Sequence, residues 1–238
     1  MEPVVGSRAT EDVRHYNDQN RTDYGLQMAK AGFVTFSVDW LGQGHLDDRR
    51  RPLHRRVWPG DPCEYFYLAA TMLGMTSLGV NMAIGRALID FVTTLPFVDA
   101  DRLGVMGLSY GGTLSVWTAL TDDRIRAASV ICYSDMFADF GYRDADFCGS
   151  QVTPSLFDLV DVPELHGLIA PRPLLVEIGA RDEIFLIEPA MKCFERVSRI
   201  YEHAGASSNL ALDLFEGGHE WHGAQSIPFF EQFLGGSA

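Results

Sequence analysis

The sequence predicts an α/β chain, with a mainly parallel sheet and helices on both of its faces. Short apolar segments alternate along the chain with segments of helical periodicity, a pattern typical of parallel sheets. The chain has 238 residues, of which 47% are hydrophobic, which suits one domain with a sizeable core. We therefore expect residues 1–238 to form a single domain, with a cap-like loop region at about residues 135–166.

The sequence predicts two helices and two strands before residue 107. A helix is expected at residues 22–31, a buried strand at 33–39 and a long helix at 78–95. A turn at residues 101–102 then leads into a short apolar strand. Helical spacing in the long helix predicts which side chains face inward, namely Val80, Ile84, Leu88 and Phe91.

The second half repeats the pattern of strands and helices. After a helix at residues 113–120 we expect a strand at 127–132, the loop region, and an apolar strand that starts at 173. Three further elements close the chain: a helix at 188–203, an alternating strand at 210–215 and a short helix at 227–234.

The most informative segment is Gly107-Leu108-Ser109-Tyr110-Gly111, a G-x-S-x-G pentapeptide between a predicted strand and a predicted helix. A serine on such a turn adopts strained backbone geometry, and the flanking glycines remove side chains that would collide. Its hydroxyl then lies at the positive end of the helix. Ser109 is therefore the candidate nucleophile and the N–H of Tyr110 the candidate oxyanion-hole donor, although glycine-rich serine turns also occur for structural reasons alone.

Two later strand ends supply partners for Ser109, because a serine hydroxyl needs a positioned base to become a nucleophile. Asp182 follows the strand that starts at 173, with Glu183 and Glu177 as alternative carboxylates. His219 follows the last strand and a glycine pair, with His222 as the alternative base. The two histidines could instead suggest a metal site, but their spacing is not that of H-E-x-x-H, and we expect no metal.

The chain order of serine, acid and histidine is that of the α/β-hydrolases. The segments GLSYGG, FCGSQ, LIAPRPLLVEIGARDEIF and FEGGHEWHG resemble the acetyl-xylan-esterase-like and dienelactone-hydrolase-like branch of that fold, from about residue 24 to the C-terminus. The resemblance implies carboxylic-ester hydrolysis, with Ser109, Asp182 and His219 as nucleophile, acid and base and with no cofactor. We expect a short-acyl carboxylesterase; a carbohydrate acetyl-ester deacetylase and a catalytically weak binding protein are the alternatives.

The N-terminus departs from this family. An α/β-hydrolase normally carries a strand that ends in an H-G-x-G-like loop, and one N–H of that loop completes the oxyanion hole. Here only Val4-Val5-Gly6-Ser7-Arg8 stands in that place. We therefore expect reduced N-terminal strands, a substitute loop at Gly6 and Ser7 or a donor from elsewhere, and a homo-oligomer that covers the exposed sheet edge.

Four aromatic residues are candidates for binding the substrate. Loops that follow the carboxyl ends of parallel strands line the ligand sites of open α/β sheets. Trp40, Trp58 and Phe147 lie in two such loops, and Trp221 lies in the segment after His219. Each of them could equally serve only to pack its loop.

Charge and cysteine content narrow the class of partners. The chain carries 19 Lys and Arg against 32 Asp and Glu, a net charge of −13, which disfavours nucleic acid and anionic membranes as partners and favours a small ester substrate. No stretch approaches the length of a membrane span, and the first residues are polar, so we expect a cytoplasmic protein. The four cysteines are expected to be buried free thiols, although Cys63 and Cys148 fall in loops that could meet over the pocket.

Overall fold

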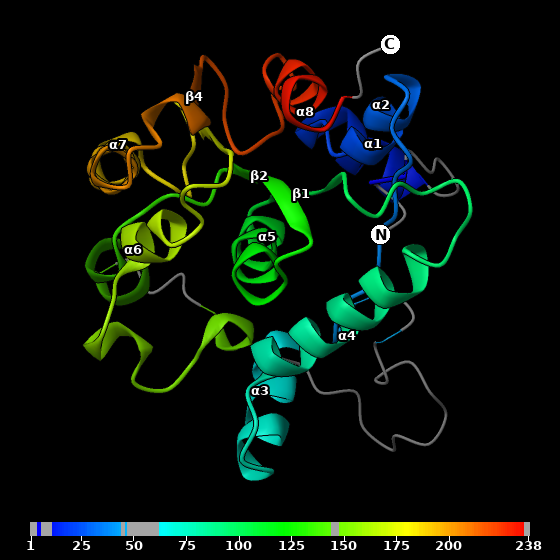
Figure 1. Ribbon diagram of the computed structural model, residues 1–238. Coiled ribbons are helices and arrows are strands. Elements are labelled where there is room, and N and C mark those ends of the chain that lie inside the picture. The colour runs from blue at the N-terminus through cyan, green and yellow to red at the C-terminus, as the bar shows by residue number, and fades with distance from the viewer. Residues whose placement is uncertain (1–3, 6–10, 44–45, 47–61, 144–147, 236–238) are drawn as a thin grey trace.

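The sheet consists of four parallel strands in the order β1 (Leu103–Leu108), β2 (Ile125–Ile131), β3 (Leu174–Gly179) and β4 (Leu210–Phe215). These strands belong to a computed structural model that describes residues 4–5, 11–43, 46, 62–143 and 148–235 (Figure 1). Since all four strands run in the same direction, their carboxyl ends lie along one edge of the sheet. The sequence prediction of a mainly parallel α/β architecture is confirmed.

Strand residues alternate between two apolar layers. Ala128 and Val130 of β2 join Val176 of β3 in the main cluster of buried side chains. Ala127 and Leu175 point to the opposite face, where they form a second cluster. Both faces of β2 and β3 are thus buried, which explains why these segments are continuous apolar runs in the sequence.

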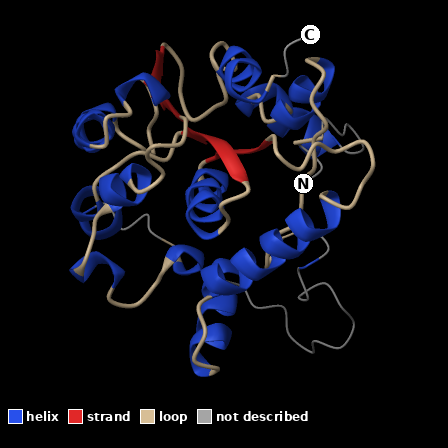
Figure 2. Cartoon of the chain, viewed as in Figure 1, coloured by secondary structure: helices blue, strands red, loops and turns tan. Residues whose placement is uncertain are grey.

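Helices cover both faces of the sheet (Figure 2). Helix α5 (Tyr110–Thr121) packs on β1 and β2 near the centre of Figure 1, with α6 (Val162–Gly167) and α7 (Ile187–His203) beside it on the same layer. The other face carries α2 (Tyr24–Lys30) and α8 (Ser226–Leu234). The remaining helices are α1 (Glu11–Asn20), α3 (Pro62–Met72), α4 (Ser77–Val92) and the short η3 (Ala138–Arg143), η4 (Gly149–Gln151), η5 (Leu156–Asp158) and η6 (Ser207–Asn209).

Most expected elements are present with shifted ends, but the prediction of a strand at residues 33–39 is wrong. These residues are not paired with any strand in the described part of the chain. A cavity of about 640 Å³ is lined both by residues 33–38 and by β1. An apolar segment becomes a strand only where its backbone hydrogen-bonds to a neighbour, and here the segment lines the cavity beside β1 without forming that ladder.

The inward face expected for α4 is also wrong. Phe91 is 59% exposed, and the buried side of the helix carries the apolar residues Leu78, Ile89 and Val92 together with Ser77, Asn81 and Gly85. The ring of Trp40 lies against Gly85, and the side chain of Asn81 bonds both to the backbone of Leu41 and to Tyr110. The inward face of α4 thus combines these contacts with the burial of Leu78, Ile89 and Val92.

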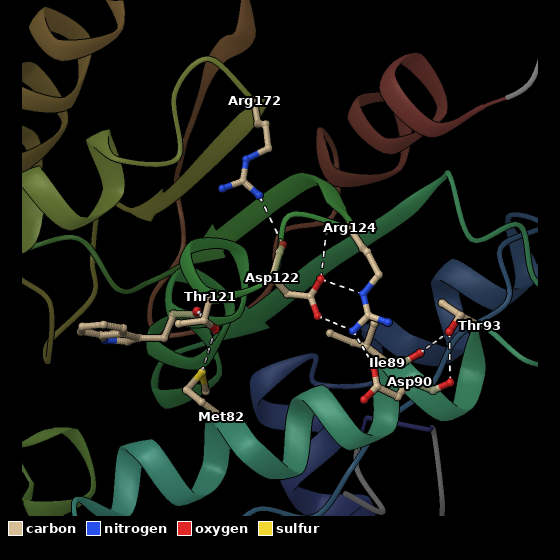
Figure 3. A network of polar contacts seen from close by, with 9 residues as sticks. Met82, Ile89, Asp90, Thr93, Thr121, Asp122, Arg124 and Arg172 are labelled. Atoms are coloured by element: carbon tan, nitrogen blue, oxygen red, sulfur yellow. Dashed lines mark hydrogen bonds and ion pairs between the residues drawn. The ribbon is translucent and has the colours of Figure 1, made fainter.

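The turn between α5 and β2 is held by charged side chains (Figure 3). Arg124 bonds Asp122 through Nε at 2.8 Å and through Nη2 at 2.6 Å, and it pairs with Asp90 of α4 at 2.7 Å. The hydrogen bonds from Arg124 hold the pKa of Asp122 below its usual range. Arg172 donates to the carbonyl oxygens of Ala119 and Ile125 at 2.7 and 3.0 Å. Together these bonds fix the end of α5 against α4 and the sheet.

Several expectations about the whole chain stay predictions. Residues 135–166 hold η3, η4, η5 and the start of α6, and a single domain with a cap-like region there is untested, as are the homo-oligomer and the cytoplasmic location. Within the described residues, no single helix combines the length and the apolar character needed to span a membrane. The helical segments Cys63–Met72 and Ser77–Val92 have this length and apolar character only when they are taken together, and a 97° bend separates them.

Candidate active site

Ser109 forms the sharp turn between β1 and α5. Its backbone has φ 60° and ψ −121°, a region that residues other than glycine rarely adopt. The turn is so tight that a Cβ on Gly107 would collide with the carbonyl oxygen of Gly111. Although Ser109 is the N-cap residue of α5, its side chain makes no capping hydrogen bond. The hydroxyl group is therefore available for chemistry at the positive end of the helix.

Asp182 and His219 are brought together by the loops that follow β3 and β4. The N–H of Ala180 donates to the carbonyl oxygen of Phe215 at 2.8 Å, and the N–H of Arg181 donates to that of Gly217 at 2.8 Å. These bonds continue the pairing of the two strands beyond their ends. His219 Nδ1 then lies 2.8 Å from Asp182 Oδ2.

The Asp182 carboxylate is buried and held at both oxygens. Its side chain is 1% exposed. Oδ1 accepts the N–H groups of Ile184 at 2.8 Å and Phe185 at 3.0 Å. Burial alone raises the pKa of Asp182, but the hydrogen bond and charge of His219 and the two N–H groups outweigh it, so the pKa lies below its usual value. Asp182 is thus an ionised, oriented partner for the imidazole, and the ring of Phe185 stacks on His219 at 5.7 Å.

Cys132 lies between the Ser109 turn and this pair. The N–H of Ser109 donates to the carbonyl oxygen of Ile131, the residue before Cys132, at 2.9 Å. The Cys132 sulfur and the ligand atoms of Asp182 and His219 all lie within 4.8 Å of one another. In the described residues the Ser109 hydroxyl forms no hydrogen bond with His219; such bonds often tighten only when substrate is bound.

The environment of Cys132 keeps its thiol neutral. Burial, followed by the charge of Asp182, raises the pKa of Cys132 far above its usual value. With Asp182 and His219 it is the one group of three potential metal ligands in the part of the chain that the structure describes. The sequence offered no signal for this residue, because it ends a strand without any motif.

His222 forms a second and separate histidine–carboxylate pair. Its Nδ1 lies 2.8 Å from Asp213 Oδ2, and its ring stacks on Phe215 at 4.9 Å. Asp213 lies within β4, whereas Asp182 lies beyond the end of β3. Cys132, next to the Ser109 turn, contacts the His219 pair, so the geometry favours His219 over His222 as the base.

The model of the prolyl oligopeptidase family matches residues 86–223, more than half of the chain, and the match includes Ser109, Asp182 and His219. The chain belongs to the prolyl oligopeptidase family. This family belongs to the serine-hydrolase superfamily and has the α/β-hydrolase fold, which confirms the fold expected from the sequence.

Individual relatives agree on the fold. YtaP of Bacillus subtilis, a hydrolase by name, is 25% identical over 195 residues, covering 81% of this chain and 61% of that protein. A Bacteroides fragilis structure described as an acetyl xylan esterase has a TM-score of 0.63 at 16% identity, over 90% of this chain and 57% of that one. A glucuronoyl esterase from Solibacter usitatus has a TM-score of 0.61 at 16% identity, over 94% and 64%. The chain thus spans about three fifths of the length of these proteins.

In this family member, a buried polar network supports the segment that carries His219. Glu177 Oε1 accepts from the hydroxyls of Ser129 at 2.9 Å and Ser226 at 2.6 Å, and Ser226 accepts from the indole of Trp221 at 2.8 Å. Burial raises the pKa of Glu177, and the nearby charge of Asp213 adds to this. Glu177 thus holds the chain after His219 instead of acting as its acid partner.

Tyr110 is held from two sides. Its hydroxyl accepts from Asn81 Nδ2 at 2.7 Å and donates to the carbonyl oxygen of Ser150 at 3.5 Å. Burial raises the pKa of Tyr110 to about 12, so the phenol stays neutral. As the first residue of α5, Tyr110 has an N–H without a partner inside the helix. Sequence reasoning missed Asn81, which no motif in the sequence marks.

The aromatic candidates for substrate binding have different positions. Trp221 is 3% exposed and packs edge-on against Tyr24, which is a core position. Trp40 is half-buried and lines the cavity beside β1; within the described residues, neither Ser109 nor His219 lines that cavity. Trp58 and Phe147, like Gly6 and Ser7 of the expected substitute loop, lie outside the described residues. Glu183, the remaining alternative acid, is exposed.

Proposed function

We propose that the protein is a serine carboxylesterase that hydrolyses short-acyl esters through an acyl-enzyme. One observation carries the proposal: Ser109 occupies a positive-φ turn at the end of β1, across Cys132 from the bonded pair of Asp182 and His219. A serine, a histidine and a buried carboxylate in this order are the parts needed for acyl transfer.

Each residue has one role in the proposed reaction. Ser109 Oγ attacks the ester carbonyl carbon while His219 Nε2 takes the hydroxyl proton, because Nδ1 is occupied by Asp182. His219 returns that proton to the departing alcohol and leaves an acyl group on Ser109. Water, deprotonated by His219, then attacks the acyl carbon. The bond to Ser109 Oγ breaks, His219 returns its proton to Oγ, and the acid is released. The N–H of Tyr110 stabilises the negative oxygen in both steps.

Net charge, structural neighbours and the family match each bear on the substrate class. A net charge of −13 favours uncharged esters over anionic ones. Structures named acetyl xylan esterase and glucuronoyl esterase share the fold, which supports acylated carbohydrates as a candidate substrate. The family match supports a second candidate function, hydrolysis of peptide bonds at proline.

Turnover of chromogenic substrates by the purified chain tests the proposal. We expect p-nitrophenyl acetate to be hydrolysed, longer acyl chains more slowly, and a prolyl p-nitroanilide hardly at all; acetylated xylo-oligosaccharides separate a deacetylase from a general esterase. Ser109→Ala should abolish turnover. Ser155→Ala is the matched control, because Ser155 is an exposed serine that also has a positive φ, of 61°. Preference for the anilide, or esterase activity that survives Ser109→Ala, would overturn the proposal.

A further inference from the structure

We propose that Cys63 and Cys148 form a peroxide-reactive thiol pair, in which the Cys148 sulfur attacks and the Cys63 thiol resolves the product to a disulfide. This site takes no part in the ester chemistry proposed above, and neither proposal depends on the other.

The segments that carry the two cysteines are in direct contact. Cys63 lies in the first turn of α3, and Cys148 immediately precedes η4. The residues that follow them are bonded, because Glu64 Oε1 accepts the N–H of Gly149 at 2.9 Å. A Cβ on Gly149 would lie only 2.6 Å from Cβ of Tyr67. The expectation that Cys63 lies in a loop is thus wrong. The two cysteines lie close enough for Cys63 to lower the pKa of Cys148, and their meeting over the pocket stays a prediction.

Several donors converge on the Cys148 sulfur. Besides Cys63, the hydroxyl of Ser150 lies 2.8 Å from Cys148 Sγ, and Gln151 Nε2 donates to it at 3.8 Å. The amide of Gln151 is oriented for this bond, because its Oε1 accepts from Thr113 Oγ1 at 2.8 Å. Hydrogen bonds to the charged form favour ionisation. The bond from Cys63 and those from Ser150 and Gln151 lower the pKa of Cys148 to about 6, against the opposing effect of burial.

The other two cysteines of the chain, Cys132 and Cys193, can be compared with this pair. Cys132 and Cys193 are buried, and burial raises the pKa of each far above its usual value. The thiolate is the reactive form towards peroxide. The structure therefore offers a Cys148 thiol with a lowered pKa and Cys63 beside it, whereas the pKa values of Cys132 and Cys193 are raised. Cys63 and Cys148 are both half-buried, which leaves part of each side chain open to a small oxidant.

Hydrogen peroxide is the oxidant in the proposed reaction of Cys148 and Cys63. The Cys148 thiolate attacks one peroxide oxygen, the O–O bond breaks, and Cys148 becomes a sulfenic acid while the released hydroxide takes up a proton to give water. The Cys63 sulfur then attacks the Cys148 sulfur and gives up its proton, and water leaves as the disulfide forms. Two thiols are oxidised by two electrons in total, and one peroxide is reduced to two water molecules.

Mass spectrometry of the reduced full chain after brief peroxide treatment tests the pair. We expect the chain to lose two hydrogen atoms and to yield a peptide that links Cys63 to Cys148. Cys63→Ser should instead gain one oxygen atom at Cys148, captured by dimedone, and Cys148→Ser should show neither product. Cys193→Ser is the matched control and should behave like the unchanged chain. Oxidation spread evenly over the cysteines, or no linked peptide, would overturn the proposal.

A second measurement on the unchanged chain keeps the test independent of folding in the variants. The rate at which iodoacetamide alkylates Cys148 should rise with pH through about 6, because the thiolate fraction controls it. A rate that rises only near the ordinary cysteine value of about 8.5 would contradict the assigned thiolate. Esterase turnover need not be present in either experiment, so failure of the proposed function and failure of this pair are distinguishable.

Discussion

Asparagine in place of Asp182 exchanges one carboxylate oxygen for an NH2 group opposite His219. The backbone N–H groups of Ile184 and Phe185 bind Oδ1 and hold the amide so that its oxygen stays on their side. The NH2 group must then face His219 Nδ1, at the place where Oδ2 now accepts at 2.8 Å. Two donors cannot pair, so the imidazole must carry its proton on Nε2 or turn away.

The size of the effect follows from these bonds. Loss of a hydrogen bond to a charged group costs about 1.5–3 kcal/mol, which corresponds to roughly 10- to 150-fold in rate. The inverted tautomer adds to this loss, since a protonated Nε2 cannot take the proton of Ser109; a comparable substitution in a serine protease lowers kcat by about 10⁴. We expect Asp182→Asn to lower kcat by about 10² to 10⁴, with little change in KM.

Initial rates of p-nitrophenyl acetate hydrolysis over a range of concentrations measure both constants. Asp213→Asn is the matched control, because it makes the same exchange in the pair with His222, also at 2.8 Å. Its kcat should stay near that of the unchanged protein. An Asp182→Asn variant that is folded by circular dichroism and loses less than about tenfold would refute the reasoning. A larger loss in Asp213→Asn would move the acid–base pair to Asp213 and His222.

Three further outcomes are expected. His219→Ala should abolish ester turnover while His222→Ala keeps most of it, and the reverse result would mean that the base is misassigned. A chelator should leave the rate unchanged; a loss restored by added zinc would point to a metal at Cys132, Asp182 and His219. Burial lowers the pKa of His166 from its usual 6.5 to about 4, so the unfolded state binds more protons between these values. Unfolding free energy should therefore fall by about 3 kcal/mol as pH drops from 6.5 to 4, and urea titrations of His166→Leu should lack this fall.

The local patterns around the candidate site could be read from the sequence. The turn at Ser109 depends on residues within a few positions of it, and so do β3 and β4, whose apolar runs end just before Asp182 and His219. Since the strands of the predicted sheet are parallel, their ends meet at one edge. The chain order of the three residues therefore implied their proximity before any contact was known.

Other features depended on contacts between distant parts of the chain. Residues 33–39 have the apolar pattern of a strand but pair with no strand in the described part of the chain. The buried face of α4 includes Gly85 against Trp40 and Asn81 bonded to Tyr110, contacts that its own apolar periodicity does not reveal. His219 and His222 lie in one short segment, but each of them is bonded to a different aspartate. The spacing of these residues in the sequence does not reveal which aspartate each histidine binds.

The order of the candidate catalytic residues and their local surroundings follow from the sequence alone: a serine on a strained turn, then a carboxylate and a histidine, each after a strand. These features are local, because backbone strain, strand formation and turns depend on neighbouring residues. Pairings without a sequence signal, such as His222 with Asp213 and Glu177 with Ser226, were known only once the fold was known. Such partners are selected by packing, since each needs burial and a fixed distance that only the folded chain provides.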